Sequence, residues 1–134
     1  MSKLDHIDTF NDAAAKAKGL LIALLSNFKT DEFGGDSAGF GNNAVASLLQ
    51  VASENLEIMG ECLFKICAVA NENTDQIGGF DFENRVLRAQ SIILSLLSDS
   101  NFETLKNNNI FSLLELATEQ VEALTAGATR LSFD

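Results

Sequence analysis

The sequence contains no proline, no tryptophan and no tyrosine, and its only aromatic residues are ten phenylalanines. Without proline, no position along the chain forces a break in a helix. Positive charge is also scarce, because nine lysines and arginines face 19 aspartates and glutamates, for a formal net charge of −10. A protein with this charge repels the phosphates of nucleic acids and anionic lipids. We therefore expect no direct binding to DNA, RNA or a membrane surface.

Long apolar runs and a targeting segment are missing as well. The longest apolar run covers residues 19–25, about a third of the ~20 residues that a membrane-spanning helix needs. The chain begins M-S-K-L-D-H-I-D, with acids where a signal peptide carries bases. These features predict a cytoplasmic protein, and a length of 134 residues predicts one domain over residues 1–134.

Reactive side chains are few. The single histidine, His6, lies near the N-terminus, where we expect it to be exposed. The chain has no Glu-x-x-His motif for a di-iron bundle. Cys62 and Cys67 fall in one predicted helix and point about 140° apart, so we expect two small core residues rather than a disulfide or a shared metal site. The sequence thus predicts no enzyme, no catalytic residue, no metal and no cofactor.

Apolar residues recur at spacings of three and four in four stretches, which is the pattern of a helix with one buried face. The first series, for example, runs through Phe10, Ala14, Ala17, Leu21 and Leu24. We predict helices over residues 4–29, 43–72, 82–98 and 109–127. The fold class is therefore all-α, an antiparallel four-helix bundle with one additional short helix.

Glycine pairs separate these helices. The motif Thr-Asp-x-apolar-Gly-Gly occurs at residues 30–35 and again at 74–79, and glycine ends helices because it adopts left-handed conformations without strain. We interpret both copies as helix stops, followed by helix starts at Asn42 or Asn43 and at Asp81. Within the first linker, 30–42, two roles remain open for the phenylalanines: they cover the end of the core, or they form a mobile binding loop.

The short helix is predicted over residues 101–107. Ser100 and Glu103 have the spacing of a capping box, in which Ser100 is the N-cap and Glu103 bonds back to it. Three asparagines at 107–109 are expected to end this helix.

Acidic residues form one stripe on each of three predicted helices, again at spacings of three or four. One interpretation is a solvated face, partly neutralised by pairs such as Glu61 with Lys65. The other is a surface that binds a basic partner or imitates a nucleic acid backbone. The candidate partner-binding residues are Asp5, Asp8, Asp12, Glu54, Glu57, Glu61, Glu115, Glu119 and Glu122, together with Phe33 and Phe40 of the first linker.

Two predicted helices carry more apolar residues than one buried face requires. The additional residues are Leu20, Ile22 and Leu25 in the first helix and Ile92, Leu94 and Leu97 in the third. A helix that is apolar on two sides contacts two neighbours or a second subunit. We therefore predict a possible homodimer through helix 4–29 or helix 82–98.

These features favour a small acidic helical protein without enzymatic activity that acts by binding another protein, such as an inhibitor, an antitoxin-like regulator, an adaptor or a chaperone. The expected partner is a basic protein. One alternative is a DNA mimic or anti-defence protein of a phage or other mobile element. A further alternative is a helical bundle that binds a small ligand.

Overall fold

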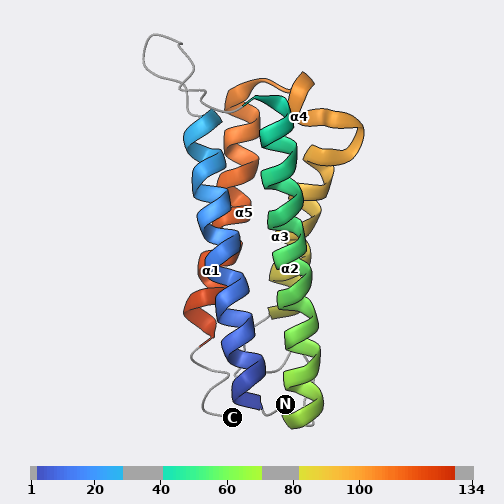
Figure 1. Cartoon of the computed structure of the whole chain (residues 1–134). Helices are drawn as coiled ribbons and strands as arrows, with labels where there is room; N and C mark the ends of the chain where they lie inside the picture. Colours follow the sequence, from blue (N-terminus) through green and yellow to red (C-terminus); the bar gives the residue numbers. More distant parts are fainter. Residues whose placement is uncertain (1–2, 29–40, 71–81, 129–134) are drawn as a thin grey trace.

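The computed structural model describes residues 3–28, 41–70 and 82–128. This part of the chain contains four long α-helices, a single-turn α-helix and a short 3-10 helix: α1 (Lys3–Phe28), α2 (Asn42–Ala70), α3 (Phe82–Leu97), η2 (Ser98–Ser100), α4 (Asn101–Thr104) and α5 (Asn107–Gly127). Successive long helices run in opposite directions (Figure 1). Helices α1 and α3 each pack against both α2 and α5, so α1 lies diagonally opposite α3, and α2 opposite α5. The predicted all-α four-helix bundle with one short helix is confirmed, and no strand occurs among the described residues.

The helix boundaries follow the apolar pattern closely. Each end of the four long helices falls within two residues of the position predicted from the periodicity. Helix α2 begins at Asn42, as expected, and the amide of Val45 donates to the carbonyl of Gly41 over 3.0 Å. The glycine pairs, the linker phenylalanines Phe33 and Phe40, and Asp81 lie outside the described residues.

The core lies along the axis of the bundle, where the apolar faces of the four long helices meet. One of its contacts joins two diagonally opposite helices. Phe10 of α1 and Phe82 of α3 are both fully buried, and their rings meet edge to face with centroids 6.2 Å apart and planes at 77°. This geometry is one that aromatic rings prefer, since the positive edge of one ring faces the negative face of the other.

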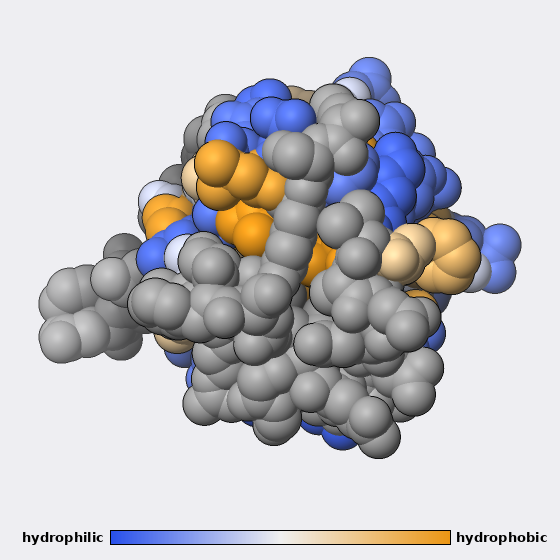
Figure 2. Space-filling view, turned by 90° about the horizontal axis from the view of Figure 1, so that it is seen from below, coloured by the Kyte–Doolittle hydropathy of each residue, from blue (hydrophilic) through white to orange (hydrophobic). Residues whose placement is uncertain are grey.

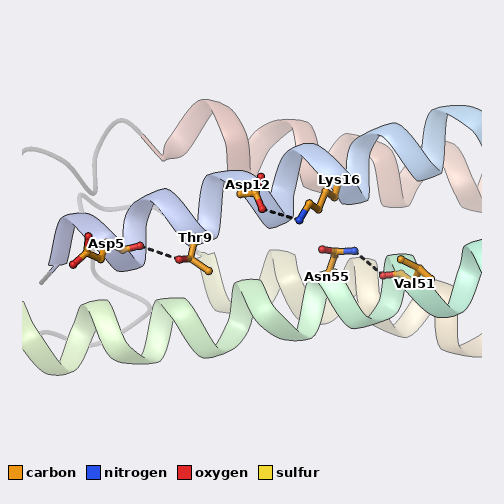
Figure 3. Close-up of polar contacts among 6 residues, drawn as sticks. All are labelled: Asp5, Thr9, Asp12, Lys16, Val51 and Asn55. Atoms are coloured by element: carbon orange, nitrogen blue, oxygen red, sulfur yellow. Dashed lines mark hydrogen bonds and ion pairs between the residues drawn. The ribbon is translucent and has the colours of Figure 1, made fainter. Parts of the chain in front are cut away.

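Two of the buried polar side chains, Asn55 and Thr118, bond to the backbone of their own helix. Asn55 donates from Nδ2 to the carbonyl of Val51 over 2.9 Å (Figure 3), and Thr118 donates from Oγ1 to the carbonyl of Leu114 over 2.7 Å. Each bond satisfies a group that would otherwise destabilise the core when buried.

The prediction that His6 is exposed is wrong, because its side chain is only 8% accessible. His6 lies one helical turn before Phe10, so the two side chains share a face of α1. That face is buried from Ile7 onward.

The predicted capping box is also wrong. Asp99 and Ser100 both have a φ of 53°, in the left-handed region, and Ser100 makes no capping bond from its side chain. An N-cap residue normally has extended backbone, which directs its side chain toward the first free amides. Instead, Nδ2 of Asn101 donates to the carbonyl of Ser95 over 2.8 Å.

The asparagine run begins a helix rather than ending one. Helix α4 stops at Thr104, and Leu105 and Lys106 are extended, with ψ of 151° and 147°. Asn107 is then the first residue of α5. The connection therefore reverses the chain within a few residues, which brings α5 back alongside α3 (Figure 1).

We predict that Phe10→Ala and Phe82→Ala each lower the free energy of unfolding by about 3–5 kcal/mol, because each leaves a cavity in the core. The double variant should lose less stability than the sum of the two single losses, by about 0.5–1.5 kcal/mol, because each single substitution already removes the whole ring contact. Urea denaturation followed by circular dichroism measures all three. Ile22→Ala is the control, because Ile22 is 49% exposed. Additive losses would show that the ring contact contributes nothing.

We predict that Asp99→Gly raises the free energy of unfolding by about 0.5 kcal/mol, because glycine adopts the left-handed conformation without the steric cost borne by other residues. Ser98→Gly is the matched control, since Ser98 does not share the positive φ of its two neighbours, and it should lower stability. Thermal unfolding of both variants tests this expectation, and equal shifts in Tm would contradict it.

Candidate protein-interaction surface

Within the described residues, no group of three or more His, Cys, Asp or Glu side chains could hold a metal ion. His6 and Cys62 are both buried, and neither lines any of the three grooves described below. No helix in the described ranges is long and apolar enough to cross a membrane.

Cys62 occupies the core, as predicted, with 4% of its surface accessible. Burial raises the pKa of its thiol; Lys65 lowers the pKa and Glu61 raises it, but both effects are smaller. The neutral thiol is therefore the favoured form, and Cys62 packs as a small apolar residue rather than acting as a nucleophile. The side chain of Cys67 lies outside those described.

All nine predicted acids are exposed, but they do not form one surface. Three lie on each of α1, α2 and α5. Because α2 and α5 occupy opposite corners of the bundle, their acids belong to separate sides of the molecule.

The net charge differs between the helices. In α1, three lysines balance three aspartates, and Lys16 pairs with Asp12 over 2.9 Å (Figure 3). Helix α2 has three glutamates and one lysine, a net charge of −2, while α5 has three glutamates and no basic residue, a net charge of −3. The expected pair of Glu61 with Lys65 is not among the ion pairs of the described residues. Acidity among the described long helices therefore resides on α2 and α5.

The surplus apolar residues divide into two groups. Leu20, Leu25, Ile92 and Leu97 pack partly against the core. Ile22 and Leu94 remain 49% exposed. Viewed from the end where α1 begins, the molecule shows hydrophobic areas beside hydrophilic ones (Figure 2). The large apolar side chains that are exposed are Leu4, Ile22, Val51, Ile58, Phe64, Leu87, Leu94, Leu105 and Leu116.

Three grooves between neighbouring helices are lined by described residues. The groove between α1 and α2 contains Lys16 and the groove between α3 and α5 contains Arg88, and neither is lined by an acid. The groove between α2 and α3 has a cavity volume of about 210 Å³ and differs from both. It combines two carboxylates with exposed apolar side chains, and we call it the α2–α3 groove; its lining includes Glu57, Gly60, Phe64, Glu83, Val86 and Leu87.

Phe64 and Leu87 are the prominent exposed walls of the α2–α3 groove. Phe64 is 72% exposed and Leu87 is 50% exposed. The acidic stripe of the sequence predicted Glu57 as a partner-binding residue, but no pattern predicted Gly60, Phe64, Glu83 or Leu87. Two features of the sequence could have drawn attention to the α2 side of the groove: a glycine inside a long apolar helix, and a phenylalanine next to the seam residue Leu63 rather than in the seam.

Comparison with known proteins finds no family model, no curated protein and no solved structure that the chain matches. The interpretation of the surface therefore depends on its geometry and charge. Of the surfaces described, the α2–α3 groove is the candidate site because it offers both apolar contact and charge at one place.

We predict that Cys62 reacts slowly with a thiol reagent in the folded protein. In a Cys67→Ser variant, labelling by a chromogenic disulfide at neutral pH should be at least about tenfold slower in buffer than in denaturant, because the reagent needs an exposed thiolate. Equal rates would contradict the buried position of Cys62.

The same pKa shift predicts a dependence of stability on pH. The ordinary thiol pKa is 9.0, and the folded pKa is higher. As pH rises past 9.0 the unfolded chain loses the proton first, so this thiol lowers stability above that pH and has no effect well below it. The Cys62→Ala variant should therefore lose less stability at alkaline pH than the wild-type protein does. The urea midpoints of the two proteins, compared from pH 7 to pH 10, measure this difference.

Proposed function

We propose that this protein has no enzymatic activity and acts by binding a basic protein partner, as an inhibitor, antitoxin-like regulator, adaptor or chaperone in the cytoplasm. The observation that carries the proposal is the α2–α3 groove, where exposed carboxylates adjoin exposed apolar side chains.

Neither component of this groove is needed for the fold. Exposed charges contribute about 0–1 kcal/mol each to stability even when they are paired. A 72% exposed phenylalanine buries little of its surface in the core. Apolar side chains that are exposed together with a polar rim are typical of protein-interaction sites. The combination therefore favours a role in binding.

The size of the α2–α3 groove disfavours a small ligand at this site, whereas the α1–α2 and α3–α5 grooves, with about 390 and 550 Å³, fall within the range of ligand sites. Sites that enclose a drug-sized ligand have volumes of roughly 300–1,000 Å³, whereas the α2–α3 groove has about 210 Å³. A cavity of this size accepts one large side chain of a partner protein rather than a whole ligand.

The DNA-mimic alternative rests on α5. Its three glutamates at positions 115, 119 and 122 are all exposed, and the helix has no basic residue to balance them. A DNA mimic binds through charge, so its complex weakens steeply with salt and competes with duplex DNA. An apolar groove instead retains its partner at high salt. Salt dependence therefore separates the two functions.

We predict that the immobilised protein retains a basic protein from lysate of its host in about 1 M salt as well as in about 0.1 M salt, because screening weakens charge pairs but not apolar contacts. The retained proteins are identified by mass spectrometry. Release by salt and by duplex DNA would indicate the DNA mimic, and retention of no basic protein would overturn the proposal.

Two matched variants locate the surface used. One replaces Glu54, Glu57 and Glu61 with glutamine, and the other replaces Glu115, Glu119 and Glu122. Each removes three charges, so the total charge of the two variants is equal. We expect the α2 variant to bind the partner more weakly than the wild type at low salt and the α5 variant to bind it as the wild type does. Sedimentation velocity on the same samples tests the homodimer through α1 or α3, which a monomer at high concentration would exclude.

A further inference from the structure

Gly60 is one of the residues that line the groove between α2 and α3. Gly60 lies inside the 29-residue helix α2, where glycine is less favourable than alanine. A Cβ built at this position would lie 3.8 Å from Cγ1 of Val86, an ordinary contact distance. Packing therefore does not require a glycine here. A larger side chain would instead fill the groove that Gly60 leaves open.

The groove is apolar at its base and its walls. Leu56, Leu63 and Val86 form a buried floor, and Phe64 and Leu87 stand exposed above it. An apolar side chain of a partner that enters over Gly60 would contact this floor and remove Phe64 and Leu87 from water. Such a contact is favourable because it buries apolar surface on both partners.

The rim of the groove is acidic. Glu57 lines it from α2 and Glu83 from α3, and both are exposed. No lysine or arginine lines this groove, whereas Lys16 and Arg88 line the other two. The charge that complements this rim is positive, so basic residues should flank the apolar anchor of the partner.

The backbone of the occupant must also be accommodated. An extended segment would place unpaired amide and carbonyl groups against an apolar floor, and among the described residues no strand edge is available to pair with them. A helix satisfies these groups internally. Laying an amphipathic helix into a groove between two helices is a common mode of recognition.

We propose that the α2–α3 groove binds one amphipathic helix of the partner, which inserts an apolar side chain over Gly60 and places lysines or arginines beside Glu57 and Glu83. This inference rests on the proposed function, since it specifies the site and the chemistry of the basic partner. A second copy of this chain fits less well, because it would bring a net charge of −10 to an acidic rim.

The test uses a fluorescein-labelled synthetic helical peptide of about 15 residues, with leucines at i, i+4 and i+7 and lysines on its other faces. Binding to the full chain is measured by fluorescence anisotropy. A peptide of the same pattern with glutamate in place of lysine is the control and should not bind. Binding of neither peptide, or of both equally, would overturn the inference.

Two matched substitutions locate the binding site. Gly60→Leu fills the α2–α3 groove, and Gly19→Leu places the same side chain in the α1–α2 groove. Both glycines lie within helices, and the nearest atom to an added Cβ is at 3.8 Å or beyond 4 Å. Both variants should therefore fold, which circular dichroism verifies. Gly60→Leu should weaken binding by at least about tenfold and Gly19→Leu by less than about twofold. Equal effects would overturn the inference.

A charge reversal distinguishes the effect of the groove's acidic rim on binding from the effect of the protein's net charge. Glu57→Lys and Glu54→Lys change the net charge equally and lie on the same helix, but only Glu57 lines the groove. At low salt, Glu57→Lys should weaken binding by about tenfold and Glu54→Lys by less than about threefold. Equal losses would mean that only net charge acts, and the inference would fail.

The outcomes distinguish this inference from the function on which it rests. If the native basic partner is retained equally by wild-type protein and by Gly60→Leu, the groove is not its site, but the proposed function stands. If no basic protein is retained, the proposed function fails as well. If wild-type protein forms a dimer that Gly60→Leu dissociates, a second copy occupies the groove and the inference is overturned.

Discussion

The structure depends on the mutual burial of four apolar helix faces. No disulfide, metal or cofactor is needed for this arrangement, because a chain of this length buries enough apolar surface to form a core. The edge-to-face contact of Phe10 with Phe82 links two helices that are not neighbours in the bundle. This contact therefore joins diagonally opposite helices in addition to the contacts between neighbours. The outer faces of the helices are not used for core packing.

The proposed binding surface lies on these outer faces, in the α2–α3 groove. A rigid pair of antiparallel helices holds the walls of the α2–α3 groove at fixed positions. Phe64 and Leu87 project from different helices and face the same groove. Their positions follow from the core contacts beneath them, made by Leu63 and Val86. The groove is thus a direct product of core packing.

The fold could be predicted from the sequence because the apolar spacing is regular and uninterrupted by proline. The errors were local. His6 was judged by its place in the chain, but its burial depends on the face it shares with Phe10. Ser100 matched a capping motif, yet its left-handed backbone directs the side chain elsewhere.

The candidate site was only partly predictable. Exposure of Glu57 follows from its place on the helix, opposite the seam. A groove, however, depends on which side chains of two separate helices face each other, and this requires the register between α2 and α3. The spacing within each helix does not determine that register, so Glu83 and Leu87 could not be associated with Gly60 in advance.

The distribution of charge among the helices affects which helices become neighbours in the bundle. Helix α3, with two arginines and one glutamate, contacts both α2 and α5, the two acidic helices. An alternative bundle that exchanged the places of α3 and α5 would put α2 beside α5, two parallel helices of like charge. Repulsion between their glutamates disfavours that misassembled isomer. The acids of α2 and α5, some of which we propose to attract a basic partner, therefore also favour the native arrangement of neighbouring helices.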